Sequence, residues 1–191
     1  MATNCHRWIC FNDVYLTLAI CTMRIRCLLI VVAPLVVSTA AAGAQPAGHC
    51  KRSETTYFSC KLYGSPKIVS LCGGQLPGAT ADTSELWLQY RFGKPGHLEL
   101  VYPKKPRASL SKFEGESRHG LGVRLDAVSF TICKIKYVLE SSYSELTGNA
   151  FDGVRVYSKG QDQPISLLCE SVPTGDGDFG QLANEIDPTP R

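Results

Sequence analysis

Short stretches of alternating apolar and polar residues, separated by turn-forming residues, run through the chain from residue 55 onward. The clearest alternation is Glu85–Phe92. Its apolar positions are Leu86, Leu88, Tyr90 and Phe92, and the positions between them are Glu85, Trp87, Gln89 and Arg91. His97–Tyr102 alternates in the same way. A period of two places successive side chains on opposite faces of a strand, so both stretches predict β-strands with one buried face.

Further runs rich in β-branched and aromatic residues predict more strands. They are Thr55–Lys61, Lys67–Cys72, Lys112–Glu116, Leu125–Thr131, Ile135–Tyr143, Asp152–Ser158 and Ile165–Glu170. Residues 73–84 form a loop by composition, and no convincing amphipathic helix is found. We therefore expect an all-β fold, an antiparallel barrel or sandwich of about eight strands.

The turn between the two alternating strands constrains how they pair. Facing residues must lie on the same side of the sheet, so the loop needs an odd number of residues. A three-residue loop, Lys94–Gly96, places Gly96 in the left-handed region and Arg91 opposite Glu99 as an opposite-charge pair. A five-residue loop with the same register is the alternative, because Pro95 disfavours the α region at Lys94.

The first 44 residues do not belong to this strand pattern. Residues 23–44 have the layout of a secretory signal peptide: Arg24 and Arg26, an apolar run from Cys27 to Val37, and the small-residue cleavage sequence Ala42–Ala44. That run is shorter than the roughly 20 residues of a membrane-spanning helix. We interpret 1–22 as a mis-annotated extension, 45–171 as a single β domain and 172–191 as a flexible acidic tail.

Removal of the leader changes the composition. Of the 191 residues and formal charge of +3, 147 residues and a charge of +1 would remain, which gives no electrostatic reason to predict nucleic-acid binding. Of the nine cysteines, five would remain. An exported protein meets an oxidising compartment in which disulfides persist. We therefore predict a periplasmic or secreted protein without a membrane span.

Four of the five remaining cysteines are expected to form two disulfides. The four are Cys50, Cys60, Cys72 and Cys169, and they allow three pairings. We favour Cys50–Cys72 with Cys60–Cys169, because residues of the first hairpin then meet the segment that precedes it and the last strand. A Cys60–Cys72 bond is disfavoured, because these residues do not face each other if the first hairpin turns near Gly64. Cys133 is predicted to be a free thiol, either buried or exposed and able to link a dimer.

Several short motifs resemble a family of small exported bacterial β-proteins. They are Phe58–Cys60 (FSC), Val69–Cys72 (VSLC) and Leu88–Gly93 (LQYRFG). The resemblance covers roughly Cys50 to Cys169 and implies an exported β-protein, but it implies no activity. The sequence departs from that family at Ile132–Lys134, where the family would have a glycine-containing turn, so Cys133 is an additional cysteine.

A looser likeness concerns the segment Tyr157-Ser158-Lys159-Gly160. It is similar to the aromatic-x-Lys-Gly segment of the periplasmic inhibitors of C-type lysozyme, which are also small disulfide-bearing β-barrels. That likeness implies a lysozyme or another envelope protein as the partner, with Tyr157 and Lys159 at the contact.

Trp87 and Arg91 form the other candidate binding site. Trp87 lies on the otherwise polar face of its strand, so it is either an exposed contact residue or covered by a loop or a second sheet. No nucleophile motif, zinc spacing or complete calcium loop is present, and we predict no catalytic residue, metal or cofactor. The resulting hypothesis is a non-enzymatic binding or inhibitor module. Its alternatives are a structural or stress-accessory envelope protein and, more remotely, a hydrolase using Cys133 and His119.

Overall fold

The computed structural model describes residues 48–75 and 86–186. The predicted extension and signal peptide, residues 1–22 and 23–44, lie outside the described residues. Within the described part of the chain, no helix is both long and apolar enough to cross a membrane.

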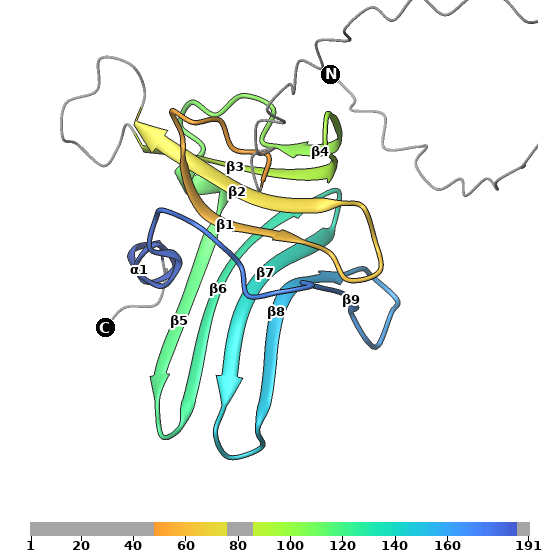
Figure 1. The fold of residues 1–191 in the computed structure, drawn as a ribbon, viewed down its shortest axis with the longest axis vertical. Coiled ribbons are helices and arrows are strands. Elements are labelled where there is room, and N and C mark those ends of the chain that lie inside the picture. The colour runs from red at the N-terminus through yellow and green to blue at the C-terminus, as the bar shows by residue number, and fades with distance from the viewer. Residues whose placement is uncertain (1–47, 76–85, 187–191) are drawn as a thin grey trace, which may run out of the picture. The chain divides into compact units, whose positions relative to one another are not determined.

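The first of two antiparallel sheets has four strands in sequence order (Figure 1). They are β1 (Thr55–Lys61), β2 (Ile68–Gln75), β3 (Leu86–Lys94) and β4 (His97–Tyr102). Apolar residues also occupy alternate positions in the neighbouring strand β2, where Val69 and Leu71 are fully buried. One face of this sheet is therefore apolar and packs into the core, as the period of two predicts.

The second sheet has five strands, again in sequence order (Figure 1). They are β5 (Glu114–Gly120), β6 (Val123–Ile132), β7 (Ile135–Ser144), β8 (Asn149–Tyr157) and β9 (Ile165–Leu168). A short 3-10 helix, Leu110–Lys112, precedes β5. The prediction of an antiparallel all-β fold is confirmed. The two sheets stay separate, and no closed barrel forms over residues 48–75 and 86–186.

The two sheets share one hydrophobic core. Its centre is aromatic: Tyr90 of β3 packs against Phe130 of β6 with ring centroids 4.9 Å apart, and Phe130 stacks on Tyr102 and Tyr137 at 4.8 and 5.1 Å. Burial, with a smaller effect of Tyr137, raises the pKa of the Tyr90 hydroxyl, which therefore stays neutral. Aromatic side chains from both sheets thus hold the layers together.

Two disulfides join distant segments to the first sheet. Cys50 bonds to Cys72 and Cys60 bonds to Cys169, so the favoured pairing is confirmed. Beyond Cys169 the chain runs beside β1, where the amide of Thr174 donates to the carbonyl of Ser59 at 2.8 Å. An exposed strand edge invites pairing with other chains, and this segment covers part of the β1 edge.

The C-terminal segment contains a helix that the sequence analysis did not predict. Helix α1 (Phe179–Glu185) begins at Asp178, whose side chain accepts a hydrogen bond from the amide of Gln181. Leu182 and Ala183 are buried, and α1 lies beside β5 (Figure 1). The contact is close because Gly115 has no side chain: a Cβ there would lie 1.9 Å from the Ala183 carbonyl oxygen. Part of the expected flexible tail is therefore a docked helix.

The β3–β4 turn differs from the prediction. Lys94 pairs with His97, so the turn has two residues, Pro95 and Gly96, and an irregularity between Phe92 and Gly93 restores the register. Arg91 consequently faces Val101 rather than Glu99. The loop was expected to have an odd number of residues so that facing side chains share one side of the sheet. A β-bulge has the same effect with a two-residue turn, because its extra residue shifts one strand by one position. The predicted Arg91–Glu99 pair was wrong.

Candidate functional site

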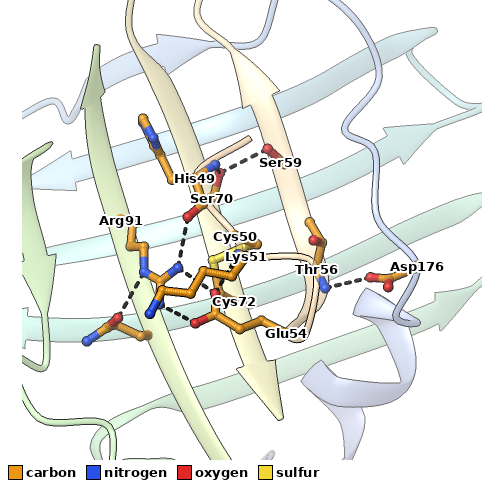
Figure 2. Close-up of a disulfide and its surroundings, with 11 residues drawn as sticks. His49, Cys50, Lys51, Glu54, Thr56, Ser59, Ser70, Cys72, Arg91 and Asp176 are labelled. Carbon is orange, nitrogen blue, oxygen red and sulfur yellow. Dashed lines mark hydrogen bonds and ion pairs between the residues drawn. A yellow bond between two sulfur atoms is a disulfide. The ribbon is translucent and has the colours of Figure 1, made fainter. Parts of the chain in front are cut away.

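Trp87 and Arg91 are not exposed binding residues. Both lie on the outer face of β3, yet Trp87 is 8% exposed and Arg91 is 7% exposed. The segment from Gly48 to Glu54 lies over the Arg91 side chain and is tied to β2 by the Cys50–Cys72 disulfide (Figure 2). Of the two possibilities that the sequence left open for Trp87, the covered one is correct.

Arg91 is held in a dense set of hydrogen bonds (Figure 2). Its guanidinium forms two contacts with the Glu54 carboxylate, at 2.5 and 2.9 Å, and also donates to the His49 carbonyl at 2.8 Å. Its Nε donates to the Gln89 side chain at 2.9 Å. A bidentate guanidinium–carboxylate pair combines charge with fixed geometry, so this cluster anchors the covering segment to the sheet.

The Glu54 carboxyl reflects this environment. Burial alone would raise its pKa, but the hydrogen bonds from Arg91 and from the Lys51 amide outweigh burial and hold the pKa below the ordinary value of 4.5. Glu54 is therefore ionised at neutral pH and balances the buried charge of Arg91.

The remaining polar groups under the covering segment are also engaged. The His49 amide donates to the Ser70 hydroxyl at 2.9 Å, and the hydroxyls of Ser70 and Ser59 are 2.9 Å apart. The His49 ring lies 3.0 Å from the Gly93 carbonyl oxygen. These bonds satisfy polar groups that burial would otherwise penalise. The polar side chains around Arg91 are therefore paired within the molecule.

Tyr157 and Lys159 remain accessible at the end of β8. Tyr157 is 42% exposed, and Lys159 is exposed in the turn that follows. Gly160 adopts a φ of 87°, which the left-handed turn requires. The structure does not bring Tyr157 and Lys159 together with Trp87 and Arg91, because the two pairs belong to different sheets and the second pair is covered.

Cys133 is not the free thiol that we predicted. It is disulfide-bonded. It is exposed in the β6–β7 turn, whereas His119 pairs with Arg124 near the opposite end of β6. The Cys133–His119 combination considered for a hydrolase is therefore not assembled.

His119 instead belongs to a small polar cluster around Asp126. This aspartate is buried, and one of its oxygens contacts both the His119 Nε2 and the Ser117 hydroxyl, each at 2.8 Å. The serine bonds to the aspartate and has no bond to the histidine, so the relay that would activate a serine nucleophile is not formed. The cluster fixes the β5–β6 hairpin.

The most exposed apolar side chains of the second sheet lie at two adjacent hairpin ends, at the bottom of Figure 1. Leu121, between β5 and β6, is 97% exposed, and Leu146, between β7 and β8, is 79% exposed. The Glu145 amide donates to the Gly122 carbonyl at 2.7 Å and joins the two ends. We call Gly120–Gly122 and Glu145–Gly148 the paired tips.

The paired tips were not among the residues predicted from the sequence. A leucine between two glycines at 120–122 was the available signal, because glycines mark a tight turn and an apolar residue has no packing role at its apex. The alternation that identifies strands carries no information about residues beyond the strand ends.

No group of three or more histidine, cysteine, aspartate or glutamate side chains suited to hold a metal ion occurs in the described segments. Comparisons with protein-family models, with curated proteins and with solved structures found no match.

Proposed function

We propose that this chain is an exported, non-enzymatic binding module of the bacterial envelope, a disulfide-stapled β-sandwich that docks a partner protein through its paired tips. The observation that carries the proposal is Leu121, which is 97% exposed at the apex of a turn. Two disulfides are compatible with a periplasmic or extracellular location.

The support for the proposal is energetic. Leu121 and Gly122 have φ values of 51° and 72°, the two left-handed residues of a type I′ turn, where Asn-Gly is the preferred pair. A left-handed leucine costs about 1–2 kcal/mol, and its exposure forfeits the burial of an apolar side chain, about 1.5–3 kcal/mol. Neither cost is offset inside this molecule, whereas burial of Leu121 in a complex would offset both.

The charges near the paired tips favour a protein over a lipid bilayer as the partner. Glu145 immediately precedes Leu146, and its side chain lies against Gly122, where a Cβ would come within 3.1 Å of the carboxylate. Insertion of both leucines into a membrane would carry this carboxylate toward the hydrocarbon, which is unfavourable. A partner protein with an apolar cleft and a polar rim accommodates two leucines and one carboxylate.

The test uses retention of envelope proteins on the immobilised full chain, compared between variants. We expect the double variant L121N/L146S to lose a protein that the wild type retains, because hot-spot side chains carry most of the binding energy. Tyr63→Ser is the matched control, because Tyr63 is 74% exposed and belongs to the β1–β2 turn. Its substitution should leave retention unchanged.

Four outcomes would count against the proposal. Equal retention by wild type and L121N/L146S would exclude the paired tips as the contact, and binding to lipid vesicles that the double variant loses would exclude a protein partner. Loss of a partner, with C-type lysozyme as the defined candidate, on Lys159→Ala but not on L121N/L146S would place the contact at the Tyr157–Gly160 turn. Retention of nothing by any variant would favour the structural alternative.

A further inference from the structure

A second feature, independent of the paired tips, is a cavity of about 400 Å³ at the margin of the core. It lies between the first sheet, helix α1 and the 3-10 helix, and eight described residues line it. Seven of these provide an apolar or aromatic wall: Tyr57, Leu86, Trp87, Leu88, Leu110, Leu182 and Ile186. An apolar pocket with a few polar groups at its edge is the usual form of a small-molecule site.

Close packing at two glycines fixes the positions of the residues that form the cavity wall. Gly73 of β2 has no side chain beside the cavity wall, and a Cβ there would lie 2.6 Å from the Tyr57 ring and 3.0 Å from a Leu88 methyl. Helix α1, which supplies Leu182 and Ile186, is set at its distance by the Gly115 contact. The volume falls in the range of small-molecule sites, about 300–1,000 Å³.

The polar groups at the cavity are acidic or neutral. Glu185 is exposed and lines the cavity, and its carboxylate accepts a hydrogen bond from Gln181 at 2.8 Å. Burial, and then the carboxylates of Glu185 and Asp176, raise the pKa of the Tyr57 hydroxyl, which remains a neutral donor. None of the eight lining residues is basic.

We infer that this cavity binds a small amphiphile with an apolar body and a cationic head group, the body against Tyr57, Leu110 and Ile186 and the head beside Glu185. The apolar wall accounts for affinity, and the carboxylate selects the sign of the head group. Trp87 also lines the cavity and provides a reporter.

The test is isothermal titration of the full chain with decyltrimethylammonium, and with decyl sulfate of equal chain length, both below their micellar concentrations. We expect saturable one-site binding of the cation and about tenfold weaker binding of the anion, because the Glu185 charge attracts one head group and repels the other. The change in Trp87 fluorescence, followed in a Trp8→Phe background, should saturate with the calorimetric signal.

Two substitutions separate the apolar wall from the charge. Ile186→Trp should fill the cavity and abolish binding of both probes, and Leu110→Trp repeats this test if the first variant does not fold. Glu185→Gln should weaken the cation about three- to fivefold and largely remove the preference between the two head groups. Leu168→Trp, at an exposed position of β9 that does not line the cavity, is the matched control and should bind as the wild type does.

The inference fails if no saturable binding occurs, if both tryptophan variants bind normally, or if the anion binds as well as the cation. The double variant L121N/L146S should bind the probe as the wild type does, so the outcome here does not depend on the paired tips.

Discussion

The outer face of the four-stranded sheet and the ends of the five-stranded sheet reverse the usual relation between polarity and exposure. On the first, Arg91 and Glu54 are charged and almost completely buried. At the second, Leu121 and Leu146 are apolar and almost completely exposed. The buried charges are matched by bonds within the molecule, whereas the exposed leucines have no counterpart inside it. Stability accounts for the first region, and binding is the function proposed for the second.

The largest expected effect concerns the links that cover the first sheet. Removal of the Cys60–Cys169 disulfide by C60S/C169S should lower the free energy of unfolding by about 4–5 kcal/mol, because this bond closes a loop of 109 residues. C50S/C72S, which opens a loop of 22 residues, should cost about 3 kcal/mol. Urea unfolding of both variants measures the difference, and the reverse order would contradict the loop-length argument.

The buried ion pair should be almost as important. Glu54→Ala should destabilise the protein by about 3–5 kcal/mol, because it leaves the Arg91 guanidinium buried without its carboxylate. The matched control is Glu99→Ala, which breaks a pair with Lys67 whose side chains are both about one-third exposed, and it should cost at most about 1 kcal/mol. Equal losses in urea unfolding would show that the covering segment does not depend on Arg91.

A smaller effect is expected from pH. The pKa of Glu54 is lower in the folded than in the unfolded protein, so its contribution is fully present above the ordinary value of 4.5. That contribution is lost as the pH falls below 4.5 and through the folded pKa. Glu54→Gln should therefore show a shallower loss of stability than wild type between pH 5 and 3, about the width of a carboxyl titration. Parallel curves for the two proteins would refute this assignment.

Substitution at the paired tips should stabilise the protein, whereas the substitutions above destabilise it. Leu121→Asn should raise the free energy of unfolding by about 0.5–1 kcal/mol, because asparagine tolerates the left-handed conformation better than leucine. Lys134→Gly provides a comparison, since Lys134 has a φ of 69° in the β6–β7 turn and should show a gain of similar size. A loss of more than about 1 kcal/mol in Leu121→Asn would reveal an intramolecular role for Leu121.

The strands could be predicted because their signal is local. Alternation in Glu85–Phe92 and the β-branched run at Thr55–Lys61 each report a strand within a few residues, and β1 has the predicted bounds. Helix α1 had a signal too: Phe179, Leu182, Ala183 and Ile186 have helical spacing behind a capping Asp178. The pattern covers only two helical turns, so it does not distinguish a helix from a polar loop. A helix this short is stable only when it packs against another surface, and the sequence does not show that surface.

The candidate site could be predicted only in part. Tyr157 and Lys159 are exposed as expected, because a turn beyond a strand end is usually solvated. Trp87 and Arg91 could not be assigned, because their strand face is polar in the sequence whether water or another segment covers it. His49 and Glu54, which contact Arg91, are 42 and 37 residues away from it along the chain, and no local pattern reports a contact at that separation.

The sequence by itself determined the all-β class and most of the strands, because alternation is a local signal. It favoured one of three cysteine pairings, and the structure showed that pairing. Only the tertiary structure decided that Arg91 and Glu54 are buried together, that the chain beyond Cys169 covers part of the β1 edge, and that Leu121 and Leu146 lie at adjacent hairpin ends. The burial or exposure of these residues depends on which sheet surfaces other segments cover. Such coverage involves residues far apart in the sequence and is fixed only when all the strands have assembled.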